Sequence, residues 1–157
     1  MEHIYHYRWS AKRSVTVVLI LTLILISMPD FLAPSLVFHR PLNRADLHKI
    51  IAMNHPQPEL VKAIIQVESE WKSKAISSKG ARGLMQILPS SAKLYAGADK
   101  EELFYPDRNI EIGCIILKHY QKNTKSLQQA LNKYSGGAKN YYKKVMAAYE
   151  TKQKKTL

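Results

Sequence analysis

Residues 58–71, PELVKAIIQVESEW, have the spacing of an amphipathic helix and constrain the fold more than any other stretch of the chain. Pro58 suits the first turn of such a helix, where its missing N–H costs nothing. Leu60, Ile64 and Glu68 then stand one turn apart on the apolar side. A carboxylate therefore falls among side chains that are expected to be buried.

Glu68 differs in this respect from its near neighbour Glu70, which lies on the opposite, polar stripe with Lys62 and Gln66. An ionised carboxylate on an apolar face must find partners, or it keeps its proton with a raised pKa. Glu68 could be a buried residue satisfied by backbone N–H groups or a salt bridge, or lie at a frayed helix end. It could also be a catalytic group. The helix alone leaves these alternatives open.

The length of 157 residues suits one domain with a hydrophobic core. The single cysteine, Cys114, excludes an intramolecular disulfide and argues against a cysteine-rich metal site. It lies in NIEIGCIILKHY, which is apolar nearly all round, so we interpret it as a packing residue. Outside the N-terminus no histidines have metal-ligand helical spacing, and we expect no metal and no cofactor.

An uncharged segment, residues 15–28, follows three basic residues near the N-terminus. Fourteen helical residues span about 21 Å, less than the roughly 30 Å hydrocarbon core, which is typical of a signal peptide. No Ala-x-Ala-like cleavage site follows; the best candidate, Ala33, precedes a proline. Extending the segment to residue 38 gives a length that could cross a membrane, but it admits Asp30 and two prolines. Residues 1–40 are therefore predicted to be a signal peptide or an uncleaved membrane anchor.

The remaining chain divides into a globular domain, residues 41–150, and a basic tail, residues 151–157. The basic residues before the apolar segment are expected in the cytoplasm, with everything after residue 40 outside it. From residue 41 onward, 20 lysines and arginines face 10 acidic residues. Such a surface suits an acidic polymer of the cell envelope, although it could also serve only solubility.

The globular part is expected to be all-α, because no stretch alternates as a strand does. Asn43 and Ser126 are predicted N-caps, and Gly97 a helix end. Residues 72–89 are rich in serine and glycine and predict a loop with a short helical piece. The predicted helices cover residues 42–55, 58–71, 90–97 (capped by Ser90 or Ser91), 107–122 (starting at Asp107 or Asn109), 126–134 and 138–152.

Residues 68–92, ESEWKSKAISSKGARGLMQILPSSA, resemble the catalytic region of the soluble lytic transglycosylase domain, a lysozyme-like fold that cleaves peptidoglycan. The matching elements are Glu68-Ser69, Ser77, GARGLMQ and PSSA. Further on, DRNIEIG and ALNKYSGG resemble two more family motifs, the second with Tyr134 matched and Ser135 where the family usually has Asn. The resemblance covers residues 45–147, and several spaced elements in order make it specific.

The resemblance implies that Glu68 is the catalytic acid and base. Glycoside cleavage needs a carboxylic acid that keeps its proton near neutral pH, which suits a carboxyl on an apolar face. In the family, the 6-hydroxyl of the muramic acid attacks C1 of the same sugar. The product carries a 1,6-anhydro-muramic acid end, and no water is consumed, so the reaction is formally that of a lyase.

Four further residues match the family's groove: Ser77, Met85, Gln86 and Tyr134. Ser77 and Gln86 would orient the acetamido group and the acid, but they could also only cap the loop. Met85 would line a sugar subsite, although filling the core is the more usual role of methionine. The hydroxyl of Tyr134 would reach the acid, or would simply point to water. The match gives Trp71 no role as a sugar platform.

The sequence thus favours a lytic transglycosylase on the periplasmic side of the inner membrane of a bacterium, anchored there or secreted. Its small size suggests wall opening for a secretion, conjugation or pilus apparatus. A lysozyme-type peptidoglycan or chitin hydrolase would need a second carboxylate, for which Asp99, Glu101, Glu102, Asp107 and Glu111 are candidates. A non-catalytic glycan-binding scaffold remains a further alternative, whereas a nucleic-acid binder does not fit the export segment.

Overall fold

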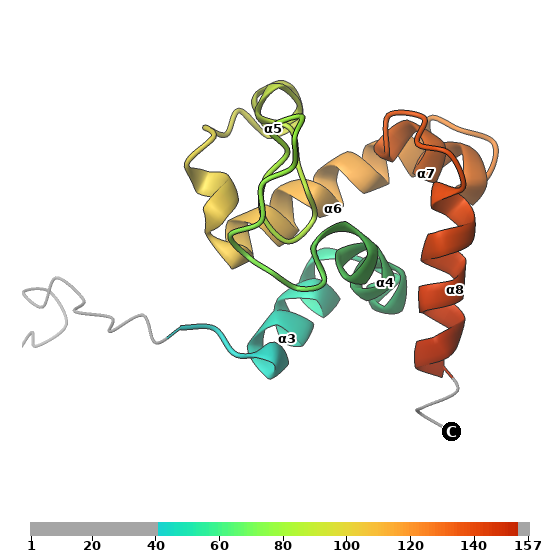
Figure 1. The fold of residues 1–157 in the computed structure, drawn as a ribbon, viewed down its shortest axis with the longest axis horizontal. Helices are drawn as coiled ribbons and strands as arrows, with labels where there is room; N and C mark the ends of the chain where they lie inside the picture. Colours follow the sequence, from blue (N-terminus) through green and yellow to red (C-terminus); the bar gives the residue numbers. More distant parts are fainter. Residues whose placement is uncertain (1–40, 154–157) are drawn as a thin grey trace, which may run out of the picture. The chain divides into compact units, whose positions relative to one another are not determined.

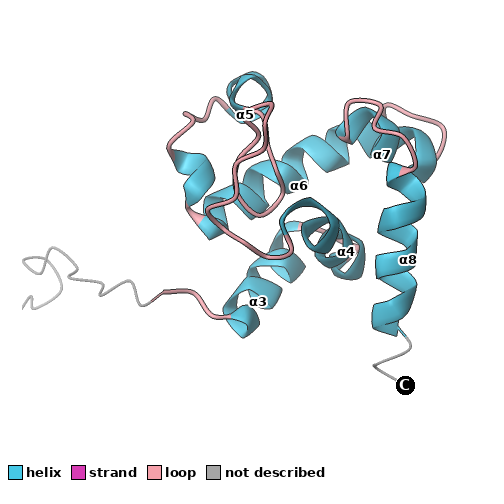
Figure 2. Ribbon diagram, in the orientation of Figure 1, coloured by secondary structure: helices cyan, strands magenta, loops and turns pink. Residues whose placement is uncertain are grey.

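The structure is a computed structural model that describes residues 41–153, and the only regular elements in that range are helices. The predictions for residues 1–40 and for the end of the tail lie outside the described residues. The all-α expectation is confirmed (Figures 1 and 2). The helices are α3 (Arg44–Asn54), α4 (Pro58–Ser69), α5 (Pro89–Ala96), the 3-10 helix η1 (Glu102–Phe104), α6 (Pro106–Lys122), α7 (Leu127–Tyr134) and α8 (Tyr141–Gln153).

The core of the domain forms around α4 and α6. α4 packs against α3 and α8, and α6 packs against α3, α5 and α7. Figure 1 shows α4 between α3 and α8, with α6 passing behind it. The apolar side of α4 is fully buried through Val61, Ile64 and Ile65. Burying each such side chain contributes about 1.5–3 kcal/mol, which ties the carboxyl end of α4 to a rigid position.

The carboxyl end of α4 differs from the prediction. The helix stops at Ser69, and Glu70 and Trp71 both adopt left-handed backbone conformations, with φ of 51° and 68°. Such values are uncommon outside glycine and need support from the surrounding structure. The buried hydroxyl of Ser69 donates to the carbonyl of Leu84 at 2.7 Å, and the Arg44 guanidinium lies 3.9 Å from the centre of the Trp71 ring. These two long-range contacts lie at the point where α4 ends.

Three of the four predicted helix caps and ends are confirmed. Asn43 forms a capping box with Asp46, Ser126 accepts a hydrogen bond from Gln129 N–H, and Gly97 ends α5 with a φ of 64°. The prediction of Ser90 or Ser91 as the cap of α5 is wrong. This helix begins at Pro89, which suits the first helical position, and the residue at its N-cap position is Leu88, whose side chain cannot accept a hydrogen bond.

Two other boundaries shift. α6 begins at Pro106, ahead of the predicted Asp107 or Asn109, and α8 begins at Tyr141 instead of Ala138. Asn140, with a φ of 61°, separates α8 from the preceding loop. A left-handed residue cannot continue a right-handed helix, so the chain turns there before α8 starts.

Residues 72–88 contain no helix, so the short helical piece predicted there is wrong. The segment is a series of turns with two isolated bridges, Ile76 to Arg82 and Arg82 to Ile87. Positive φ values at Gly80, Gly83 and Gln86 interrupt any helical run. Within residues 41–153 no helix is both long and apolar enough to cross a membrane. The apolar segment at residues 15–28 lies outside that range.

Candidate active site

A cleft of about 390 Å³ opens where the end of α4 meets the residue 72–88 loop, α6 and the segment from residue 133 to Tyr141. Glu68, Ser77, Gln86 and Tyr134 all line it. Four of the five residues singled out in the sequence are therefore brought together, although they come from three separate parts of the chain. Tyr141 lines the same cleft and was not predicted.

Glu68 lies in the last turn of α4, where it reaches both the core and the cleft. Its Oε1 accepts a hydrogen bond of 2.6 Å from the hydroxyl of Tyr141. No salt bridge and no backbone N–H contacts it among the described residues. Burial raises the pKa of the Glu68 carboxyl, and the Tyr141 hydrogen bond opposes that rise only in part. The carboxyl therefore tends to hold its proton and can serve as an acid.

Glu70 lies on the polar side, as predicted. It is exposed, and its carboxylate pairs with the Lys72 ammonium at 2.9 Å. Glu68 and Glu70 are only two positions apart in the chain, but the first is largely buried and the second is exposed. Only Glu68 faces the cleft.

Tyr141 makes the contact that was expected from Tyr134. The Tyr134 hydroxyl instead donates to the carbonyl of Met85 at 2.9 Å, which ties α7 to the loop beneath the cleft. Burial raises the pKa of both tyrosines, so each hydroxyl keeps its proton and acts as a donor. Tyr141 could not be chosen from the sequence, because Tyr142 follows it and the predicted start of α8 was Ala138 instead of Tyr141.

Ser77 and Gln86 both cap the loop and line the cleft. Ser77 Oγ accepts from Ala81 N–H at 3.1 Å. Gln86, with a φ of 47°, donates through Nε2 to the carbonyls of Gly83 and Ala75 at 2.9 and 3.2 Å. Its Oε1 makes no hydrogen bond with the described residues. The capping and the groove-lining interpretations therefore hold together, because the same side chains serve both.

Met85 does not line the cleft. Its side chain is fully buried, and a Cβ added at Gly113 of α6 would lie 2.4 Å from its sulfur. Gly113 thus lets the methionine pack directly on the helix backbone. Met85 fills the core, and it touches the site only through its carbonyl, which accepts the Tyr134 hydroxyl.

Asn109 is a second residue that the sequence analysis missed. It is fully buried on α6, and its Oδ1 accepts from Met85 N–H at 2.8 Å while its Nδ2 donates to the carbonyls of Arg82 and Leu103 at 3.0 and 2.9 Å. A Cβ at Gly83 would lie 2.2 Å from Nδ2. Asn109 therefore holds the glycine-containing loop in place. The signal was an asparagine on the buried side of α6, one turn before Gly113.

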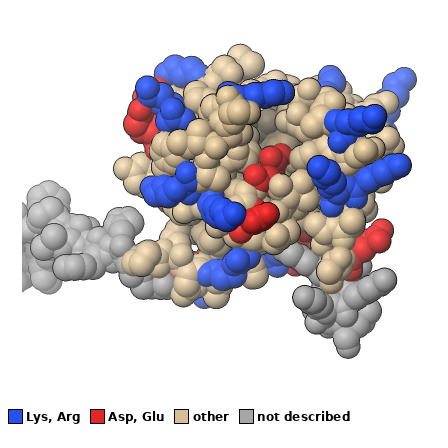
Figure 3. Space-filling view, in the orientation of Figure 1, with Lys and Arg blue, Asp and Glu red and all other residues tan. Residues whose placement is uncertain are grey.

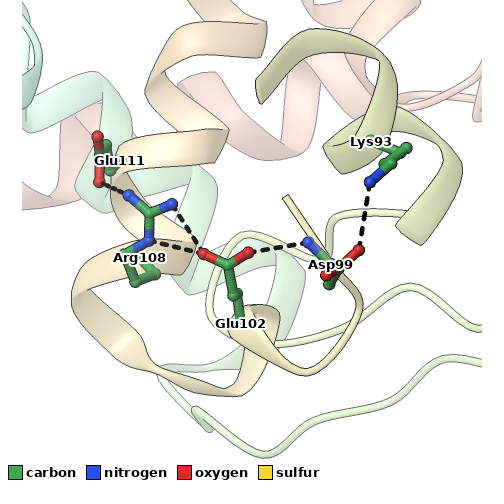
Figure 4. Close-up of polar contacts among 5 residues, drawn as sticks. All are labelled: Lys93, Asp99, Glu102, Arg108 and Glu111. Atoms are coloured by element: carbon green, nitrogen blue, oxygen red, sulfur yellow. Dashed lines mark hydrogen bonds and ion pairs between the residues drawn. The ribbon is translucent and has the colours of Figure 1, made fainter. Parts of the chain in front are cut away.

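The five other carboxylates considered as partners of Glu68 lie away from the cleft. Figure 4 shows the Arg108 guanidinium between Glu102 and Glu111, and Asp99 beside Lys93. Hydrogen bonds from Asp99 N–H and then Arg108 lower the pKa of Glu102. Glu101 pairs with Lys100, and Asp107 is exposed. Of the carboxylates in residues 41–153, Glu68 alone lines the cleft.

The described residues contain neither a cluster of metal ligands nor a reactive thiol. No three histidine, cysteine or acidic side chains in residues 41–153 come close enough together to hold a metal ion. Cys114 is buried on α6, and burial raises the pKa of its thiol to about 12. A thiol with that pKa is protonated and inert at neutral pH, as expected of a packing residue.

The model of the transglycosylase SLT domain family matches residues 47–157, and the chain belongs to this family. The fold is similar to that of the 70 kDa soluble lytic transglycosylase SLT70 from Escherichia coli. The TM-score is 0.53 with 27% sequence identity, over 69% of this chain and 19% of that one. The lysozyme-like all-α fold expected from the sequence is thereby confirmed.

Two curated relatives match over shorter stretches. A Haemophilus influenzae protein named for a soluble lytic murein transglycosylase is 39% identical over 82 residues, which are 48% of this chain and 12% of that protein. The membrane-bound lytic murein transglycosylase E of Buchnera aphidicola is 38% identical over 78 residues, 45% of this chain and 35% of that protein. The matches thus span about a third or less of these relatives.

Proposed function

We propose that the chain is a peptidoglycan lytic transglycosylase that cleaves the β-1,4 bond between N-acetylmuramic acid and N-acetylglucosamine, with Glu68 as acid and then base. The observation that carries this proposal is the environment of Glu68. It is the one carboxylate of the described residues in the cleft, and burial raises its pKa. The names of the relatives and the family support the same reaction.

In the first step, protonated Glu68 gives its proton to the glycosidic oxygen as the bond between C1 and that oxygen breaks. The leaving sugar departs as an alcohol, and positive charge develops at C1 and the ring oxygen. The ionised Glu68 remains beside it, with Tyr141 donating to Oε1. A hydrogen bond to the charged form of an acid becomes stronger as the acid ionises, so Tyr141 favours this step.

In the second step, the Glu68 carboxylate takes the proton of the 6-hydroxyl while that oxygen bonds to C1. The acid is regenerated, and the product carries a 1,6-anhydro bridge. Because the nucleophile belongs to the substrate, its attack is intramolecular, an advantage that reaches roughly 7–11 kcal/mol in well-oriented systems. This route needs no second protein carboxylate, in agreement with the lining of the cleft.

Ser77 and Gln86 are assigned to holding the sugar. Gln86 lines the cleft, and its amide oxygen has no hydrogen-bond partner among the described residues, which suits the N–H of an acetamido group. Tyr134 and Asn109 are assigned a supporting role. Tyr134 also lines the cleft, but both side chains form hydrogen bonds with the backbone of Met85 and so hold the loop in place. Rigid support of this kind is what sugar positioning requires.

The test is digestion of purified sacculi by the full chain, with mass spectrometry of the products. Anhydro ends without incorporation of heavy oxygen from labelled water support the proposal. Label at C1 would make the protein a lysozyme-type hydrolase. Binding of sacculi without any cleavage would make it a glycan-binding scaffold.

We also propose that residues 1–40 attach the domain to the inner membrane and place it in the periplasm, where it opens the wall for an envelope-spanning apparatus. The uncharged segment after basic residues supports this placement. Cell fractionation should recover the full-length chain with the membrane, and protease outside that membrane should remove the domain. A soluble product that starts between residues 29 and 41 would show a cleaved signal peptide instead.

A further inference from the structure

Two lysines line the cleft, one from each of its facing segments. Lys79 belongs to the loop between Ser77 and Ala81, and Lys133 lies in the last turn of α7. Both are exposed, and neither forms an ion pair or a side-chain hydrogen bond with any residue from 41 to 153. By contrast, Lys62, Lys72, Lys93 and Lys100 each have a carboxylate partner.

The cleft contains no carboxylate that could neutralise these lysines except Glu68, whose raised pKa favours its neutral form. The visible face of the domain likewise carries many lysines and arginines and few acidic side chains (Figure 3). The cleft therefore has a net positive potential, and a ligand that brings carboxylates there gains attraction without displacing a protein partner.

The wall beside Lys133 also leaves room for more than a sugar chain. Ser135, Gly136 and Ala138 line it without a large side chain, and a Cβ added at Gly136 would meet nothing within 4 Å. In peptidoglycan, the lactyl group of the muramic acid carries a short peptide with free carboxylates. Such a peptide projects sideways from the glycan strand. It could therefore extend along the open wall beside Lys133 while the sugars lie in the cleft.

We propose that Lys79 and Lys133 bind the carboxylates of the peptide carried by the muramic acid, so that the cleft selects strands by the charge of their peptides. This inference rests on the proposed function, because it takes the strand to lie in the Glu68 cleft. It assigns the two lysines to substrate selection, with no part in the bond cleavage itself.

The experiment compares cleavage of two substrates by the full chain: native sacculi, and sacculi whose carboxylates have been converted to neutral amides. At low ionic strength the native substrate should be cleaved about ten-fold faster, the size expected of two exposed ion pairs. The double variant Lys79→Gln/Lys133→Gln should bring this ratio close to one. Lys79→Arg/Lys133→Arg should keep most of it, and added salt should reduce it.

Lys49→Gln is the matched control, since Lys49 is an exposed lysine of α3 that does not line the cleft. The inference is overturned if the double glutamine variant keeps the full ratio, or if Lys49→Gln lowers it equally. If neither the unchanged chain nor any variant cleaves either substrate, the proposed function fails. Co-sedimentation of the chain with the two kinds of sacculi then still tests the lysines, because it reads binding without turnover.

Discussion

Glu68 and Glu102 are the same residue type in opposite surroundings. Glu68 is largely buried and has one neutral donor, Tyr141, so the pKa of its carboxyl is raised. Glu102 lies at the surface and accepts from Asp99 N–H and the Arg108 guanidinium, which lower its pKa. Charge and hydrogen bonding make Glu102 a stable anion, whereas loss of water makes Glu68 a proton donor. The difference between them defines which carboxylate can do acid chemistry.

The largest effect that tests this comparison is the loss of the acid. Glu68→Gln should reduce cleavage of sacculi by about 10³-fold or more, because general acid–base groups contribute typically 10²–10⁴-fold and this one acts in both steps. Circular dichroism and sacculus co-sedimentation should remain as in the unchanged chain. Near-normal turnover of this variant would remove Glu68 from the mechanism.

Removing the one donor to Glu68 should have a smaller effect. Tyr141→Phe keeps the ring in its buried site but loses the hydroxyl, and we expect turnover to fall about ten-fold. Since the hydrogen bond lowers the pKa of Glu68, its loss should move the basic limb of the pH–rate profile to higher pH. An unshifted limb would show that Tyr141 acts only by packing.

Stability provides a third test, in which Glu68→Gln should stabilise the domain at neutral pH. The folded pKa of Glu68 lies above that of the unfolded chain, so the unfolded state loses its proton first as pH rises. The free energy of unfolding therefore falls with pH from about the unfolded pKa up to the folded one, and a glutamine escapes this loss. Urea unfolding from about pH 4 upward should show the advantage of glutamine growing with pH until the carboxyl of the folded state ionises. A constant difference would indicate a packing effect.

The smallest effect is expected at Glu102, the surface carboxylate of the comparison. Glu102→Gln should leave turnover within about a factor of two of the unchanged chain, because its carboxylate lies outside the cleft. Glu111→Gln, on the other side of Arg108, should behave in the same way. Strong inactivation of either variant in a folded protein would identify a second essential carboxylate and favour a hydrolase.

Much of the fold follows from local chemistry. The apolar spacing of residues 58–71 predicted α4, and side-chain caps predicted the starts of α3 and α7. Such signals depend on residues within one or two helical turns, so they can be recognised without knowledge of distant contacts. The end of α4 and the start of α8 could not be predicted in this way. Each depends on left-handed residues, Glu70 and Asn140, whose types do not require that conformation.

The sequence by itself determined the helical class, the family resemblance and the identity of Glu68 as a carboxyl on an apolar face. The tertiary structure decided which tyrosine donates to it, that Met85 fills the core, and that Asn109 holds the loop. The physical reason is distance along the chain: Tyr141 and Glu68 are separated by 73 residues, and no local pattern records their contact. Periodicity fixes the side of a helix that a residue occupies, whereas only packing between helices fixes what it meets there.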